Sequence, residues 1–424
     1  MQRYTEEQSN IMIQYEKFTL SNGLKVIHHP DITTPMVAMS ILYDVGAKDE
    51  DEKQTGFAHL FEHLMFGGSV NIDDYDEPLQ NAGGENNAYT TNDLTNYYLQ
   101  LPKENIETAF WLESDRMLNL AFSEKSLDVQ RKVVCEEFKE HYINKPYGDV
   151  WQYLRELCYK VHPYKWQTIG KELKHVEDAQ LQDVKHFFAK HYNPSNAIMC
   201  IAGNITKEKV VELCDKYFAP IPAGEKYLRN LPTESAQTEA RKLVIERDVP
   251  VNALYKAYHM GSRLSNGYHA ADLITEILSG GESSRLHVEL VKEQKLFSQI
   301  DCYHLGSIEP GLLVIDGKVS ANVSMQEADD AIEKIIEQFI AIGITELELK
   351  KAINKTESLI SFEDLSLLNR ANNLSYYELL GDAEMMNSEM GKYATVSAEQ
   401  VHIEAKIIFR KENSNTMWYV SKGV

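Results

Sequence analysis

The chain has 424 residues, of which 43% are hydrophobic and 25% are charged, values typical of a soluble globular protein. This length exceeds that of one ordinary hydrophobic core, so we expect two or more domains. The 43 basic and 64 acidic side chains give a net charge of −21. That charge argues against a nucleic-acid partner and against an anionic membrane surface, because both bind basic protein surfaces.

The N-terminus and the cysteines predict a cytoplasmic protein. Residues 1–7 contain no apolar core and predict no signal peptide. No apolar run is long enough to span a bilayer. The five cysteines lack close pairs, which indicates thiols in a reducing compartment rather than disulfides or a zinc knuckle. They are Cys135, Cys158, Cys200, Cys214 and Cys302.

The first predicted elements are strands. Residues 15–28 alternate around Ser21-Asn22-Gly23, and Asn-Gly between apolar runs is the strongest short hairpin signal. The apolar run 36–43 predicts a buried strand. An acidic loop, 49–52, then leads into the next helix.

The segment 56–68 predicts a short helix that carries a metal-binding stripe. At about 100° per residue, His59, Glu62 and His63 share one face, and the apolar side chains take the opposite face. Gly67-Gly68 ends the helix. Two imidazoles one turn apart can bind one zinc ion, and the Glu can act as general base. This order, His-x-x-Glu-His, is the inverted zinc-peptidase motif, although a solvated polar helix face would give the same pattern.

Further along the first half, periodicity predicts three helices and two strands. A zinc site with two histidines lacks a ligand, and the second of these helices supplies candidates for it. Spacing does not choose among Glu136, Glu137, Glu140 and His141. The predicted helices cover residues 104–118, 126–143 and 179–191, and the strands cover 94–101 and 196–202.

The second half repeats the first. A linker at 219–235 holds three of the twelve prolines, which predicts domains at 1–218 and 236–424. Residues 250–261 echo 35–46, a helix over 268–278 ends in a Gly-Gly pair, and 413–420 echo 194–201. These landmarks, in the same order, indicate duplication of one α+β unit.

The second copy has lost the metal stripe. Aligning the two Gly-Gly pairs places the stripe opposite Asp272, Thr275 and Glu276. We therefore expect catalysis in the first half, with the second half shaping substrate binding.

Two stretches, 59–63 and 130–137 (QRKVVCEE), carry a family resemblance. The chain resembles the pitrilysin/insulinase family of inverted-motif zinc peptidases, which includes the mitochondrial processing peptidases. The resemblance implies Glu137 as third zinc ligand with His59 and His63, and Glu62 as catalytic base. Family members often carry Glu where this chain has Gln130, which keeps the hydrogen bonding and drops the charge, so we regard Gln130 as auxiliary near the site.

The stretch 87–98 is similar to the active-site edge strand of that family. The resemblance implies that Asn87, Ala88 and Tyr89 bind an extended substrate, with the Asn close to the scissile peptide. Such β-augmentation gives affinity through backbone hydrogen bonds and tolerates many sequences. An ordinary polar strand is the alternative.

Many relatives grip the substrate with an Arg and, seven residues on, a Tyr in the second half. This chain has Val291 and Ser298 at those positions, and Arg285 belongs to a different landmark. Because some relatives divide the work between two chains, we predict a heterodimer with a homologous metal-free subunit that supplies the Arg/Tyr pair. A homodimer is possible.

These observations predict an α+β fold of two repeated units with antiparallel sheets, and the family resemblance implies the clamshell type of the processing peptidases. The predicted function is that of a zinc-dependent metalloendopeptidase acting on peptides or unfolded polypeptides. The alternatives are a non-catalytic structural or peptide-binding subunit of a processing-peptidase-like heterodimer, and a peptide-binding chamber without cleavage.

Overall fold

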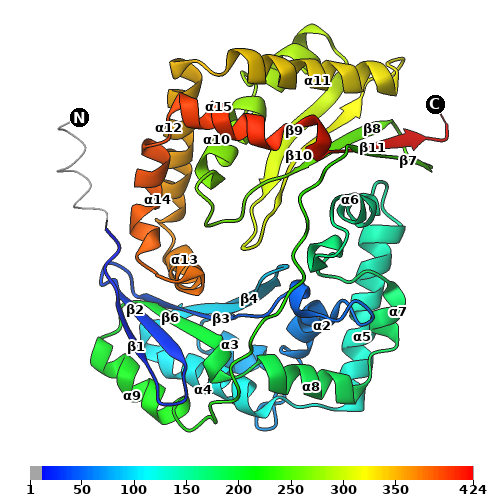
Figure 1. The fold of residues 1–424 in the computed structure, drawn as a ribbon. Coiled ribbons are helices and arrows are strands. Elements are labelled where there is room, and N and C mark those ends of the chain that lie inside the picture. Colours follow the sequence, from blue (N-terminus) through cyan, green and yellow to red (C-terminus); the bar gives the residue numbers. More distant parts are fainter. Residues whose placement is uncertain (1–11, 424) are drawn as a thin grey trace, which may run out of the picture. The chain divides into compact units, whose positions relative to one another are not determined.

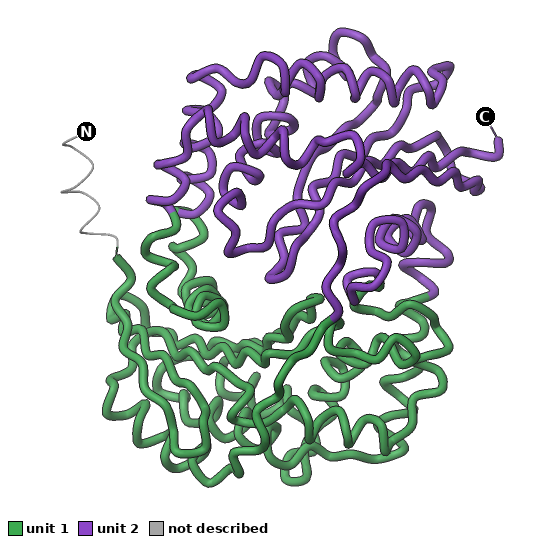
Figure 2. Tube along the Cα trace, viewed as in Figure 1, with its two compact units in different colours: residues 1–138, 166–231, 361–389 green, residues 139–165, 232–360, 390–424 purple. Residues whose placement is uncertain are grey.

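The computed structural model describes residues 12–423. Residues 1–7, on which the prediction of no signal peptide rests, lie outside this range. The chain forms two compact units (Figure 2). The first holds residues up to 138, 166–231 and 361–389, and the second holds 139–165, 232–360 and 390 onward. These units interleave along the chain, whereas the predicted domains are continuous segments, and that domain division stays a prediction.

The first unit is built on a six-stranded sheet of order β1-β2-β6-β3-β5-β4 (Figure 1). The hairpin predicted around Asn22-Gly23 is confirmed, since β1 and β2 pair antiparallel with Thr19 opposite Lys25. The buried strand predicted over 36–43 is also confirmed with the same bounds, as strand β3. The strands are β1 Glu16–Thr19, β2 Lys25–Pro30, β3 Met36–Tyr43, β4 Glu85–Thr90, β5 Thr95–Pro102 and β6 Ala197–Gly203.

The second unit is built on a five-stranded sheet of order β7-β11-β8-β10-β9, which repeats β2-β6-β3-β5-β4 of the first sheet. Every pairing also keeps its direction. This match confirms the duplication. The strands are β7 Arg241–Arg247, β8 Ala253–His259, β9 Phe297–Leu305, β10 Leu312–Val319 and β11 Ser414–Ser421.

Each sheet contains one parallel pair that the expectation of antiparallel sheets did not include. These pairs are β2 with β6 and β7 with β11. The paired strands come from the two ends of each repeat, and the chain between them is long enough for the crossover that a parallel pair needs. The repeated fold class is confirmed, with mixed rather than purely antiparallel sheets.

The stretch 87–98 is a hairpin and not a single strand. Strand β4 ends at Thr90, and β5 begins at Thr95. Between them the Thr91 hydroxyl accepts hydrogen bonds from the amides of Asp93 and Leu94, both at 3.0 Å. These hydrogen bonds from backbone amides to a side-chain hydroxyl stabilise a tight turn that reverses the chain. It leaves β4 at the sheet edge, paired only with β5.

The helices predicted in the first half are confirmed, with shifted ends. The helix predicted over 126–143, which holds the candidates for the third ligand, is α5 Glu124–Phe138. A π-helical turn, Lys139–Ile143, follows it. Within the first unit, α2 (Phe57–Leu64) packs against α5, α8 (Leu181–His191) and β4, and α13 (Leu367–Leu380) packs on β3 and β6. The helices before residue 220 are α2 Phe57–Leu64, α3 Asp76–Asn81, α4 Ile106–Asn119, α5, α6 Val150–Cys158, α7 Leu173–Glu177, α8 Leu181–His191 and α9 Lys207–Tyr217.

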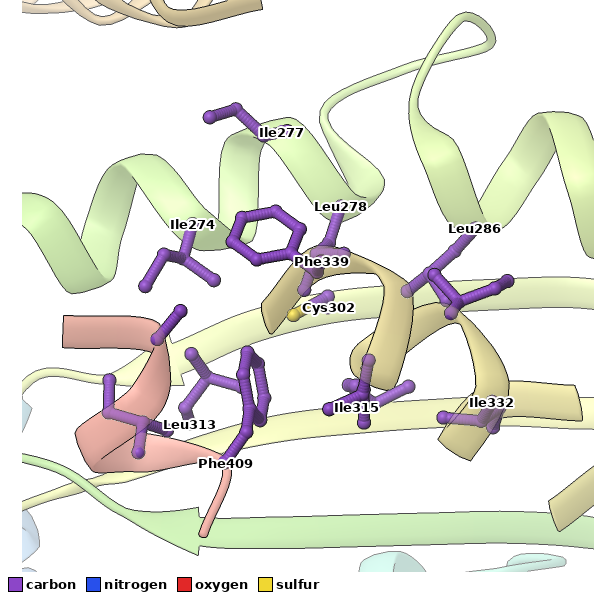
Figure 3. Close-up of a cluster of buried hydrophobic side chains, with 14 of the residues drawn as sticks. Ile274, Ile277, Leu278, Leu286, Cys302, Leu313, Ile315, Ile332, Phe339 and Phe409 are labelled. Atoms are coloured by element: carbon purple, nitrogen blue, oxygen red, sulfur yellow. The ribbon is translucent and has the colours of Figure 1, made fainter. Parts of the chain in front are cut away.

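The core of the second unit lies between one face of its sheet and helices that include α10, α11 and α15 (Figure 3). Ile274 and Leu278 of α10, Phe339 of α11 and Leu313 and Ile315 of β10 lie in this cluster. Side chains of α6 cover the opposite face of the sheet. The later helices are α10 Tyr268–Ser279, α11 Met325–Ile342, α12 Glu346–Glu363, α13 Leu367–Leu380, α14 Met385–Ala394 and α15 Ala398–Ile408. Among the described residues, no helix combines the length and the apolar composition needed to cross a bilayer.

Candidate metal centre

Helix α2 is amphipathic as its sequence predicts. Its apolar side chains Phe57, Leu60, Phe61 and Leu64 are at most 5% exposed. Phe61 stacks on Tyr192 with ring centroids 4.6 Å apart, which fixes the rotation of the helix about its axis. The polar stripe is half-buried. The helix therefore presents its two histidines and its glutamate from a firmly packed base.

Three of the predicted site residues converge. The nearest ligand atoms of His59, His63 and Glu137 all lie within 4.8 Å of one another, and no other such group occurs among the described residues. Oε2 of Glu137 lies 3.4 Å from Nε2 of His63 and 3.8 Å from Nε2 of His59. Two ligands at 2.0–2.2 Å on a tetrahedral zinc ion are roughly 3.3 Å apart. The donor set and its spacing fit zinc.

The tertiary structure distinguishes Glu137 from the other candidates on its helix. Glu137 is half-buried, beside the buried Phe138. The side chains of Glu136, Glu140 and His141 are exposed, and none of them joins the histidine pair. The packing of α5 against α2 makes this choice.

The environment suits metal binding and base chemistry. Burial, reinforced by the neighbouring His63, lowers the pKa of His59 to about 4. The His59 ring is therefore neutral near pH 7 and can donate a lone pair to a metal. Burial raises the pKa of Glu62, and a hydrogen bond from Thr90 opposes that rise. Glu62 thus lies in a partly desolvated position on the same helix as His59 and His63, the kind of position that suits a general base.

Thr90 is a site residue that the sequence reasoning did not single out. Its hydroxyl donates a 2.6 Å hydrogen bond to Oε2 of Glu62. Thr90 is the last residue of β4, and strand alternation gives it the same face as Ala88. That alternation was the available signal, but only the packing of β4 on α2 shows which face meets Glu62.

Replacing Thr90 by Val is expected to lower kcat of peptide hydrolysis by about 10-fold with zinc content unchanged, because one hydrogen bond that orients Glu62 is lost. Steady-state kinetics on a quenched peptide, with metal analysis, would measure this. Thr90→Ser, which keeps the hydroxyl, should restore most of the activity. Equal kcat for the Val variant and wild type would contradict the orienting role.

The predicted substrate strand has the geometry that strand addition needs. Asn87, Ala88 and Tyr89 lie in β4, whose outer edge pairs with no strand among the described residues. The Asn87 side chain accepts the amide hydrogen of Ala88 at 2.8 Å, and the Tyr89 ring packs beside Tyr98. Gln130 lies on α5, half-buried. The roles of these four residues stay predictions.

In the second unit, side-chain interactions replace the metal stripe. Asp272 Oδ1 lies 2.9 Å from Nε2 of His304, and its Oδ2 accepts a hydrogen bond from Tyr393 at 2.6 Å. Glu276 forms an ion pair with Lys355 at 2.8 Å. Among the described residues, the second unit contains no group that could hold a metal.

The positions aligned with the Arg/Tyr pair make contacts within the second unit. Val291 packs against the core of the second unit, and the Ser298 hydroxyl donates to the Lys318 carbonyl at 3.3 Å. Arg285 forms two hydrogen bonds to Glu348, at 2.7 and 2.9 Å, and a third to the Gly343 carbonyl. Arg285 is thus held by hydrogen bonds within its own unit.

Known families and proteins match a large part of this chain. The model described as Insulinase (Peptidase family M16) matches residues 25–172, and the one described as Peptidase M16 inactive domain matches 178–356. A Helicobacter pylori protein named zinc protease PqqE is 29% identical over 82% of this chain and 80% of its own length. The beta subunit of the Saccharomyces cerevisiae mitochondrial-processing peptidase is 30% identical over 49% of this chain and 45% of its own.

Solved structures agree. A Helicobacter pylori protease superposes with a TM-score of 0.90 at 26% identity, covering 96% of this chain and 100% of that one. Pitrilysin, at 17% identity, has a TM-score of 0.76 and covers 96% of this chain and 45% of its own, which supports the fold alone. With the inverted motif, its converging Glu and the duplicated fold, these matches establish that the chain belongs to the pitrilysin/insulinase family of peptidases, M16.

Proposed function

We propose that the chain is a zinc-dependent metalloendopeptidase that hydrolyses peptides or unfolded polypeptides bound as extended strands. One observation carries the proposal: the imidazoles of His59 and His63 and the carboxylate of Glu137 converge at zinc-ligand spacing. Glu62 lies on α2, the helix that carries the two histidines. It is half-buried, and a hydrogen bond from Thr90 orients its carboxylate. Its relatives include proteins named as zinc proteases.

The residues divide the reaction among them. His59, His63 and Glu137 would hold a zinc ion, which when bound would supply polarisation of the scissile carbonyl and a lowered pKa of water. Glu62 accepts the proton of the attacking water and passes it to the leaving amine. Thr90 holds the Glu62 carboxylate at Oε2.

Strand β4 is the proposed substrate-binding element. The outer edge of the backbone from Asn87 to Tyr89 would pair with an extended peptide, and such pairing accepts many side chains. The edge strand and Glu62 meet at Thr90, since the same residue ends β4 and bonds the base. This arrangement supports the proposal that an added strand lies close to the proposed chemistry.

The proposal includes a partner of the same fold. Val291 and Ser298 stand where many relatives carry an Arg and a Tyr that contact substrate, so a homologous metal-free subunit would supply that pair. One relative is itself named as a subunit of a processing peptidase. A homodimer is the second form of this proposal.

The partner is tested by comparing the purified chain with the chain mixed with a metal-free homologue from the same source. We expect weak turnover of a quenched peptide library by the zinc-loaded chain alone and at least a 10-fold gain in the mixture, with a shift to a heterodimer in size-exclusion chromatography. Full turnover by the chain alone would contradict the partner proposal. Zinc and peptide binding without turnover in either sample would favour the non-catalytic alternatives.

A further inference from the structure

The helix that carries the metal stripe begins at a residue that cannot cap it. The N-cap of α2 is Gly56, with φ of +90°. A Cβ at this position would lie 2.7 Å from the Ile169 carbonyl oxygen, so a residue with a side chain does not fit. An N-cap normally uses its side-chain oxygen to accept the amide hydrogen of the second or third helical residue. Glycine leaves those amides without that partner.

Glu50, six residues earlier, takes over the capping. Its Oε1 accepts the amide hydrogen of Ala58, the second residue of α2, at 2.8 Å. Its Oε2 accepts the amide hydrogen of Gly56 at 2.9 Å. The side chain is 9% exposed. Burial raises the pKa of Glu50 to about 8, and the hydrogen bonds from the Ala58 and Gly56 amides oppose that rise.

The loop that presents Glu50 is itself anchored. The neighbouring Asp49 forms hydrogen bonds with the Arg229 guanidinium at 2.7 and 3.0 Å and accepts the Gly46 amide hydrogen at 3.0 Å. Two consecutive buried carboxylates thus bind different partners: Asp49 holds the loop, and Glu50 holds the helix. Glu50 has little freedom to move away from α2.

The capped turn carries a metal ligand. His59 is the third residue of α2, in the same turn as Ala58, whereas His63 lies in the last turn. The helix has only eight residues, so fraying of its first turn would move His59 while His63 and Glu137 stayed in place. We infer that Glu50 is a positioning residue that fixes the first turn of α2 and with it Nε2 of His59. The metal side of this inference rests on the proposed function.

Glu50→Gln is the sharpest test, since the amide keeps one oxygen acceptor but turns an N–H group toward one of the two amides. Glu52→Gln is the matched control, because Glu52 is exposed and pairs with Lys171. With Zn²⁺ and a competing chelator, we expect Glu50→Gln to bind zinc about 10- to 100-fold more weakly than wild type and Glu52→Gln to bind within 2-fold. The visible spectrum of the Co²⁺-loaded Glu50 variant should also change, which reports ligand geometry independently of turnover.

Amide hydrogen exchange in the metal-free proteins separates this inference from the proposed function. Faster exchange at Ala58 and its helical neighbours in Glu50→Gln, with the control unchanged, would support the capping role even if wild type bound no zinc. If the zinc affinity, the Co²⁺ spectrum and the amide exchange of Glu50→Gln all equal those of wild type, the capping inference is overturned. The proposed function stays intact in that case, because the wild type still binds zinc. If Glu50→Gln is too unstable to purify, Glu50→Asp, with its shorter reach, is measured in the same three ways and judged by the same outcomes.

Discussion

Replacing Glu62 by Gln is expected to lower peptide turnover by roughly 10²–10⁴-fold, the usual contribution of a general base, while zinc content stays that of wild type. Gln has the same shape and can still accept the Thr90 hydroxyl hydrogen now bound to Oε2. It cannot take a proton from water. Because Glu62 is not one of the three converging ligands, the metal should remain.

The measurement pairs steady-state turnover of a quenched peptide with zinc determination by elemental analysis on the same sample. Glu136→Gln is the control, since this exposed carboxylate lies outside the converging group. It should keep wild-type turnover. Full activity of Glu62→Gln would refute the role of Glu62, and loss of zinc from this variant would mean that Glu62 acts as a ligand.

Glu137→Gln is expected to weaken zinc binding on the order of 10²-fold or more, because an amide oxygen is a poorer zinc ligand than a carboxylate. Glu137 is half-buried and lies 3.4 and 3.8 Å from the two imidazole nitrogens. Turnover should fall with zinc occupancy and recover partly when excess zinc is added. This recovery distinguishes a lost ligand from a lost base, which added metal cannot replace.

Thermal unfolding provides a second measurement of the same change. Zinc at 100 times its Kd stabilises a protein by about 2.7 kcal/mol, so the wild-type Tm should rise on zinc addition. At the same zinc concentration Glu137→Gln should show little of that rise, while Glu136→Gln should match wild type. If Glu137→Gln kept full zinc occupancy, the third ligand would have to be another residue.

The sequence predicted most of what depends on local periodicity. The stripe of His59, Glu62 and His63 is separated from the buried Phe61 face by helical spacing alone. The hairpin at Asn22-Gly23 follows from turn chemistry, and the repeat follows from landmarks in matching order. Each of these features is encoded within a few residues of chain, or in the comparison of two such stretches.

Contacts between residues distant in sequence were decided by the tertiary structure. Spacing left four candidates for the third ligand, and the packing of α5 on α2 brings Glu137 to the histidines. Packing also brings the Thr90 hydroxyl to the Glu62 carboxylate. It brings Glu50 to the first amides of α2, which Gly56 cannot cap because it has no side chain. Helical and strand periods fix which residues share a face, but only the packing of one element on another fixes what that face meets. For this protein the sequence alone therefore determined a helix with two histidines and a glutamate on one face, and the fold decided which residues converge on that face.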